Sequence, residues 1–195
     1  MNTTILSILT GLGGYLSGSV MYAYLLPRIL FHVDVRNYGD GNPGAFNVHL
    51  CTSMPLAFLA AALDVLKGMI PAAFARYVLE LPDWAMLLPL AGPMLGHLYP
   101  PMLHFHGGKG ICTAFGVMIG LMPGEWYALL WAACILLLLP MIRDHRKLIL
   151  ASLALFTPLC FVIGSSAAMN LCMVVIAVLV ASRHLQDHTA GEAES

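Results

Sequence analysis

The chain has 195 residues, of which 59% are hydrophobic and 10% are charged, and its mean hydropathy is +0.83. This composition is typical of an integral membrane protein and excludes an ordinary soluble globular domain. The formal net charge of −1 provides no broadly basic surface, so we expect no nucleic-acid partner.

Seven apolar segments alternate with short polar loops, and we expect them at residues 3–30, 54–78, 84–103, 110–122, 125–142, 147–163 and 166–182. A bilayer core of about 30 Å needs roughly 20 helical residues, or about 17 when the flanks snorkel. Every segment except the fourth reaches that length. Pro123 ends the fourth segment early, so a short or re-entrant helix is one alternative, although the alternation of charges favours a crossing. The sequence predicts an all-α membrane protein, a seven-transmembrane-helix bundle with short loops.

Seven of the nine Lys and Arg residues fall in every second gap between these segments. They are Arg28, Arg36, Lys109, Arg143, Arg146, Lys147 and Arg183. Loops rich in Lys and Arg tend to stay in the cytoplasm. The N-terminus is therefore predicted to lie outside and the C-terminus inside.

The length corresponds to one domain, which we place at residues 1–187, followed by a short polar tail at 188–195 that we expect to be disordered. The first segment is long and lacks a basic start, so we interpret it as an anchor rather than a signal peptide. Five scattered cysteines show no metal-ligand spacing, and His104 and His106 alone are weak ligands. No metal and no cofactor are expected.

The first polar loop, residues 34–47, is a candidate anion site. Its glycines permit left-handed turns in which successive N–H groups form a concavity for an anion, and its amides and one guanidinium add donors. An ordinary surface turn has the same composition, and this alternative stays open. The candidate residues are Arg36, Gly39, Asp40, Gly41, Asn42, Gly44 and Asn47.

Two charged residues, Asp64 and Lys67, lie deep within the second apolar segment. Their spacing of three places them on one helical face, where they can pair. Ionisable groups at that depth point into the bundle and often mark a functional site. A structural strut that neutralises itself is the equally weighted alternative.

The second polar loop ends in Gly107-Gly108-Lys109-Gly110, directly before the fourth segment. Unpaired N–H groups, the positive end of a helix dipole and a mobile ammonium then coincide, a combination that favours phosphate or carboxylate. The spacing differs from that of a Walker A loop. Further along, the cluster Arg143–Lys147 is most simply a topogenic run that contacts anionic lipid headgroups.

Three stretches resemble the bacterial integral-membrane acyl-phosphate:glycerol-3-phosphate acyltransferase family. They are residues 18–25 with the loop 34–47, the stretch Asp64-Val-Leu-Lys67-Gly68, and Gly96-His97-x-x-Pro100 followed by the Gly107–Gly110 loop. Their order and separation match the family over most of the chain. The family has seven helices with the N-terminus outside, in agreement with the charge pattern.

The resemblance implies an enzyme of phospholipid biosynthesis in the bacterial inner membrane. It would move a fatty acyl group from acyl phosphate to the 1-hydroxyl of glycerol 3-phosphate, giving lysophosphatidate and phosphate. Lys109 and the glycine-rich backbone would hold phosphate, and His184, in the family's closing motif, would assist proton transfer or orient a phosphate. Membrane lipid would surround the acyl chain, and an enzyme that forms acyl phosphate is an expected upstream partner.

The chain departs from the family pattern at four motif positions: Asp40 replaces Ser, Phe46 replaces Thr, Leu50 replaces Arg, and Asp187 replaces Asn. Asp187 is nevertheless kept as a candidate phosphate-binding residue. An acidic group beside a phosphate is repulsive unless it is protonated or paired. Two alternatives therefore stay open: an acyltransferase with a different acceptor, and a degenerate membrane protein or small-solute carrier that uses Asp64 and Lys67.

Overall fold

The computed structural model describes residues 2–163 and 166–193, with side chains up to Gln186 in the last helix. The described residues contain no β-strand. Their helices are α1 (Thr3–Ser19), α2 (Tyr22–Phe31), α3 (Ala45–Cys51), α4 (Met54–Ala73), α5 (Leu87–Leu98), α6 (Ile111–Ile119), α7 (Tyr127–Leu138), α8 (His145–Ile163) and α9 (Ala167–Ala193). Single 3-10 turns cover Val35–Asn37, Asp83–Ala85 and Pro101–Leu103, and a π-helical turn, Phe74–Val78, extends α4.

Every predicted apolar segment contains helix, and the first contains two helices, so the all-α prediction is confirmed; the short helix α3 was not predicted. Among the described residues, four stretches are long and apolar enough to span a membrane: Thr3–Phe31, Met54–Val78, His145–Ile163 and Ala167–Gln186. The fourth segment forms α6, which has only 9 residues, as expected from Pro123. The count of seven crossings remains a prediction, since α5, α6 and α7 are shorter than a full span.

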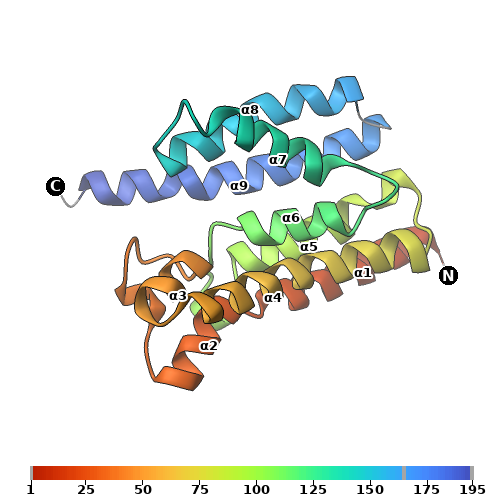
Figure 1. Cartoon of the computed structure of the whole chain (residues 1–195). Coiled ribbons are helices and arrows are strands. Elements are labelled where there is room, and N and C mark those ends of the chain that lie inside the picture. The colour runs from red at the N-terminus through yellow and green to blue at the C-terminus, as the bar shows by residue number, and fades with distance from the viewer. Residues whose placement is uncertain (1, 164–165, 194–195) are drawn as a thin grey trace.

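The helices form two groups that lie side by side (Figure 1). One contains α1, α4, α5 and α6, in which α1 packs along α5 and α4 along α6. The other contains α7, α8 and α9, and α9 joins the groups through contacts with α5. The short helices α2 and α3 lie at one end, the end towards which α9 runs. We call this the α3 end of the bundle.

The buried core runs between the two groups. Trp131 of α7 is fully buried, stacks on Phe115 of α6 with ring centroids 4.6 Å apart, and meets Phe156 of α8 at 6.1 Å. Its indole N–H donates to Ser152 Oγ at 3.0 Å, so the ring's polar atom is satisfied. Many apolar side chains face outwards, such as Leu16 (68% exposed) and Val162 (79%), as the surface of a lipid-embedded bundle requires.

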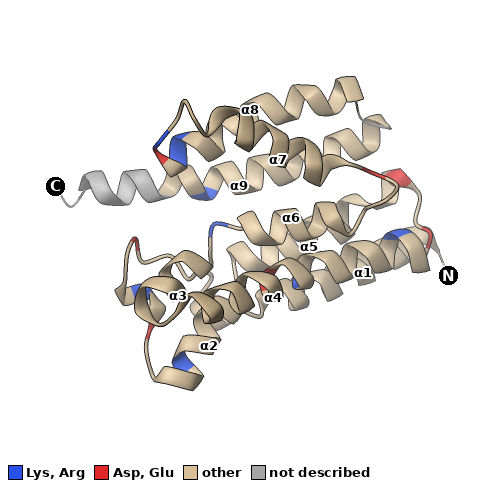
Figure 2. Cartoon of the chain, viewed as in Figure 1, with Lys and Arg blue, Asp and Glu red and all other residues tan. Residues whose placement is uncertain are grey.

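Apart from the buried pair of Asp64 and Lys67 in α4, the charged residues lie near the two ends of the bundle, and most Lys and Arg lie at the α3 end (Figure 2). All three polar clusters singled out in the sequence, residues 34–47, 104–110 and 143–147, therefore meet at one end. The opposite end carries the ion pair of Arg76 and Asp83, 2.7 Å long. Trp84 and Trp126 are exposed there, as expected for interfacial aromatic residues, whereas Tyr127 is buried and donates to Asn170 Oδ1 at 2.8 Å.

Candidate active site

A cavity of about 730 Å³ opens at the α3 end, where five segments of the chain converge. Its wall is polar along the loop before α3, the start of α6 and the start of α8, and apolar where Ala45, Phe46 and Ile111 line it. It therefore offers a polar region and an apolar region to one ligand. The lining residues are Asp40, Asn42, Gly44, Ala45, Phe46, Asn47, Asp64, His97, Lys109, Gly110, Ile111, Cys112, Asp144, His145 and Arg146.

Lys109 stands at the entrance to α6. Gly110 is the N-cap of this helix and has φ +82°, a left-handed conformation that glycine adopts without strain. Ile111 and Cys112 form the first turn and line the cavity, and N–H groups in a first turn have no partner within the helix. The predicted combination of an ammonium and a helix N-terminus is therefore present, and both line the cavity.

The two preceding glycines have a different role from the one expected. The Gly107 N–H donates to the Leu98 carbonyl at 3.0 Å and the Gly108 N–H donates to the His97 carbonyl at 3.1 Å. The expectation that these N–H groups are unpaired is therefore wrong. A Cβ at Gly108 would lie against the His97 ring, so glycine is required here for close approach to α5.

Asp40 ties the two predicted loops together. Its Oδ2 accepts from Lys109 Nζ at 2.7 Å, and its Oδ1 accepts from Asn47 Nδ2 at 2.8 Å and from the Asn42 N–H at 3.2 Å. Burial disfavours the charged form of Asp40, but the hydrogen bonds from Lys109 and Asn47 outweigh it and hold the pKa of the carboxyl below its ordinary value. Asp40, which stands where the family pattern has Ser, is thus ionised and paired with Lys109.

Asn47 organises the loop rather than pointing a free amide at a ligand. Its side chain is buried, and the amide donates to Asp40 and also to the Asn42 carbonyl at 2.9 Å. Gly39 (φ +57°) lies directly against this side chain. Gly41 also has positive φ, and Gly44 begins α3, so all three glycines shape the turn that presents Asn42 to the cavity.

Arg36 does not line the cavity. Its guanidinium binds Asp34 through Nε at 3.0 Å and Nη2 at 2.7 Å, and Arg28 approaches the same carboxylate at 3.6 Å. The hydrogen bond from Arg36 is the main reason why the pKa of Asp34 lies below its usual value. Arg36, which was predicted to bind phosphate, is therefore paired with Asp34 in an ion-pair cluster outside the cavity.

The predicted pair of Asp64 and Lys67 is present, with a distance of 2.8 Å and both side chains almost fully buried. Lys67 Nζ also donates to the Val20 carbonyl at 2.8 Å, where the chain breaks between α1 and α2. Asp64 lines the cavity, and its Oδ1 lies 4.0 Å from Nδ1 of His97. These contacts favour the structural alternative: the pair fixes the end of α1 beneath the cavity floor.

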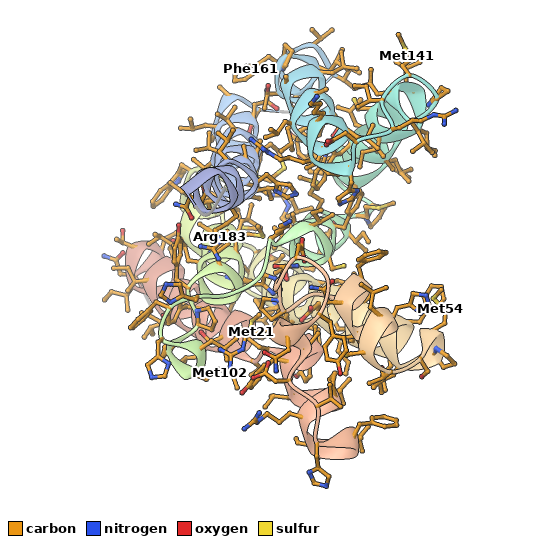
Figure 3. The ribbon with its side chains drawn as sticks, turned by 90° about the vertical axis from the view of Figure 1, so that its left-hand side faces the viewer. Met21, Met54, Met102, Met141, Phe161 and Arg183 are labelled. Carbon is orange, nitrogen blue, oxygen red and sulfur yellow. The ribbon has the colours of Figure 1, made fainter. Side chains whose placement is uncertain are left out.

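The closing motif lies beside the cavity loops rather than in the lining. His184 is buried, and its Nδ1 lies 2.9 Å from the Val180 carbonyl. The preceding Arg183 donates to the Gly107 carbonyl at 2.9 Å, and Figure 3, which looks onto the α3 end, shows it on α9 near the segment that leads into α6. Asp187 and the predicted tail 188–195 lie outside the residues whose side chains are described, so both remain predictions.

Sequence reasoning missed the contribution of the loop before α8. Asp144, His145 and Arg146 line the cavity, although the cluster was expected only to contact lipid headgroups. One signal was available: Asp144 interrupts a basic run just where α8 begins, and its Oδ1 accepts the Lys147 N–H at 2.8 Å as a cap. Of the other departures, Phe46 lines the cavity and Leu50 is exposed outside it.

Comparison with known proteins places this geometry in context. A sequence model of the family described as Glycerol-3-phosphate acyltransferase matches residues 8–190. A glycerol-3-phosphate acyltransferase of Nitrosospira multiformis is 38% identical over 178 residues, which cover 89% of this chain and 86% of the relative. One of Bordetella pertussis is 36% identical over 177 residues, covering 87% and 81%.

The fold is also similar to a solved structure. The crystal structure of PlsY (YgiH), an integral membrane glycerol 3-phosphate acyltransferase, in its glycerol 3-phosphate form, superposes with a TM-score of 0.83 at 28% sequence identity. The superposition covers 96% of this chain and 92% of that one. The same protein in its lysophosphatidic acid form gives a TM-score of 0.80.

Proposed function

Because the chain belongs to the glycerol-3-phosphate acyltransferase family and is an integral membrane acyltransferase, we propose that its cavity at the α3 end is the site of acyl transfer. The donor is a fatty acyl phosphate and the acceptor is the 1-hydroxyl of glycerol 3-phosphate. The products are lysophosphatidate and phosphate.

One observation carries this proposal: Lys109 and the first turn of α6 meet a cavity that is polar on one side and apolar on the other. The ammonium and the helix N-terminus suit a phosphate. The apolar wall at Phe46 and Ile111 suits the start of a fatty chain, which continues into the surrounding lipid. A single cavity can therefore bring a hydroxyl close to an acyl carbon.

The chemistry needs no covalent enzyme intermediate, since an acyl phosphate is already an activated mixed anhydride. The glycerol hydroxyl oxygen attacks the acyl carbon, the bond from that carbon to the phosphate oxygen breaks, and the hydroxyl proton passes to the leaving phosphate. The protein positions both substrates and stabilises the negative charge that develops. The positive charge that stabilises it comes from the Lys109 ammonium, and Asn42 adds an amide donor. His184 remains a proposed assistant that would orient a phosphate from beyond the lining.

The proposal extends to the setting of the protein. Seven crossings, with the N-terminus outside and the C-terminus in the cytoplasm, place the cavity on the cytoplasmic side of the bacterial inner membrane, where soluble glycerol 3-phosphate is available. An enzyme that forms acyl phosphate would supply the donor. The locked pair of Asp64 and Lys67 gives no support to a carrier.

The test uses protein purified in detergent or lipid, with palmitoyl phosphate and glycerol 3-phosphate, and measures lysophosphatidate. Lys109→Ala is compared with Lys147→Ala, which removes an exposed ammonium at the same end but outside the cavity. We expect product from the parent and from Lys147→Ala, and a loss of tenfold or more with Lys109→Ala, about the value of one charge-assisted contact. No product from folded parent protein would refute the proposed reaction.

A further inference from the structure

The cavity needs more positive charge than Lys109 alone provides. The proposed reaction brings two phosphorylated substrates together, and Lys109 already shares its charge with Asp40 at 2.7 Å. Among the described residues, the only other Lys or Arg in the lining is Arg146, at the start of α8. This residue belongs to α8, an element separate from the sequence motifs singled out as phosphate loops.

The other Lys and Arg residues near the α3 end either have partners within the protein or lie outside the cavity lining. Arg36 binds Asp34, and Arg183 donates to Gly107 and to Gln186 Oε1 at 3.0 Å. Lys67 is paired with Asp64. Arg143 and Lys147 are exposed and do not line the cavity.

Arg146 is a half-buried cation that forms no ion pair with the described residues. Its Nε is fully buried with no hydrogen-bond partner in the described parts of the chain. The neighbouring Asp144 attracts Arg146 electrostatically but forms no ion pair with it, and its carboxylate caps the start of α8. A buried N–H without an acceptor is unfavourable, so a ligand that supplied one would be bound.

The position of Arg146 in its helix strengthens this argument. It lies in the first turn of α8, beside the positive end of the helix dipole, where a cation is disfavoured and an anion is favoured. Asp144 offsets part of this charge, but His145, Arg146 and Lys147 follow it at once. An anion held between the guanidinium and the first turn of α8 would relieve the repulsion.

We propose that Arg146 is the second phosphate-binding residue of this cavity, beside Lys109 in the set of lining residues. The inference rests on the proposed function, because it assigns to Arg146 the phosphate of one of the two substrates. A guanidinium is planar and can donate two parallel hydrogen bonds to phosphate oxygens. Lys109, just before α6, and Arg146 in the first turn of α8 would then each hold one phosphate, with the acyl carbon and the hydroxyl between them.

The test replaces Arg146 by Gln, which keeps N–H donors but removes the charge, and by Lys, which keeps the charge but loses the fork. Arg143→Gln and Lys147→Gln are the matched controls from the same cluster. Each variant is assayed in vesicles with palmitoyl phosphate and glycerol 3-phosphate, with one substrate varied at a time. Binding of glycerol 3-phosphate and of inorganic phosphate is measured by calorimetry, and folding by melting temperature.

We expect Arg146→Gln to raise the KM of one substrate about tenfold or more, with partial recovery in Arg146→Lys and no change in the controls. The substrate whose KM changes identifies the phosphate that Arg146 binds. An active parent whose two KM values are unchanged in Arg146→Gln would overturn the inference and leave the proposed function intact.

Two further outcomes separate the alternatives. If the parent produces no lysophosphatidate, the proposed function fails. The phosphate-binding site is then judged by calorimetry: weaker binding of inorganic phosphate by Arg146→Gln than by the parent supports it, and equal binding overturns it. If all three cluster variants lose activity together, and the loss depends on the phosphatidylglycerol content of the vesicles, Arg146 contacts lipid headgroups. That result would overturn the inference.

Discussion

Asp40 pairs with Lys109, the residue proposed to bind phosphate. Its carboxylate already occupies the Lys109 ammonium and the Asn47 amide, two donors that a phosphate would otherwise engage. A phosphate that enters the cavity must share these donors with Asp40 or displace it. Because Asp40 is 51% exposed at its side chain, water screens the pair and its strength is modest.

We predict that Asp40→Asn binds the phosphorylated substrates more tightly. The amide keeps an oxygen acceptor in the loop but removes the negative charge that competes for Lys109. Exposed pairs contribute roughly 0.2–1 kcal/mol, so the KM for glycerol 3-phosphate should fall by up to about fivefold. Asp34→Asn removes an acidic group of the same loop that binds Arg36 outside the cavity, and it should leave that KM unchanged. A higher KM in Asp40→Asn would instead mean that Asp40 holds Lys109 in its working position.

The pH dependence of this effect follows from the ionisation of Asp40. Burial raises its pKa, but the hydrogen bonds from Lys109 and Asn47 lower it further, so the pKa lies below its ordinary value of 3.8. A lowered pKa means that the ionised pair stabilises the fold above the ordinary value and loses this contribution as pH falls through the folded value. The KM ratio of parent to Asp40→Asn should therefore stay constant between about pH 6 and 8. An inflection in that range would show that Asp40 is not ionised as described.

Single residues also show what sequence could and could not predict of the site. Residue type and spacing predicted Lys109, Asn42 and the turn glycines, since few other structures need an ammonium next to a glycine-rich helix start. Hydrogen-bond partners were not predictable, because they depend on which chain segment lies opposite. The carbonyls of α5 take the Gly107 and Gly108 N–H groups, and that could be learned only from the fold.

At the scale of elements, glycines set how closely the helices approach. Gly14 and Gly18 of α1 lie against Pro93 of α5, and Gly96 of α5 lies against the α1 backbone in return. Small residues four apart let helix backbones meet without a hydrophobic driving force, which lipid does not provide. The α1–α5 pair carries the loop that leads to Lys109, so its packing positions the site.

We predict that Gly18→Val destabilises the protein, because its side chain would overlap the Pro93 backbone. Overpacking of a well-packed contact typically costs about 1–3 kcal/mol. Gly13→Ala is the matched control, since nothing lies within 4 Å of a Cβ at Gly13. There Ala should be neutral or stabilising by up to about 1 kcal/mol, because Ala favours the helix. Melting temperatures in detergent measure both effects, and equal temperatures for the two variants would contradict the close approach of α1 and α5.

Hydropathy located the helices of the seven apolar segments, but neither the short helix α3 nor the breaks within those segments. Residues 3–30 were predicted as one helix, whereas the structure has α1 and α2 with a break at Val20 and Met21. These two residues are as apolar as their neighbours, so no pattern marks them. The break depends on a distant partner: the Val20 carbonyl accepts from Lys67 Nζ of α4.

At the scale of the whole molecule, the positively charged loops and the cavity lie at the same end of the bundle. The loops with most Lys and Arg share the α3 end, and the cavity opens there (Figure 2). The charges that are predicted to keep this end in the cytoplasm thus include Lys109 and Arg146, the residues proposed to bind phosphate. Charge alternation was visible in the sequence. The meeting of the α8 start with the α6 start was not, because residues 109 and 146 are joined by two helices of unpredictable packing.

The orientation of the bundle is the last prediction, and labelling of single cysteines can test it. In a variant that lacks the five native cysteines, Thr4→Cys and Lys147→Cys place one exposed thiol at each end. A membrane-impermeant maleimide should label Thr4→Cys in intact cells and Lys147→Cys only after permeabilisation. The reverse result would place Lys109 and Arg146 outside, away from the cytoplasmic supply of phosphorylated substrates, and labelling of both in intact cells would indicate dual insertion. Since the cavity opens at the Lys147 end, the orientation decides from which side of the membrane the enzyme can bind its water-soluble substrate.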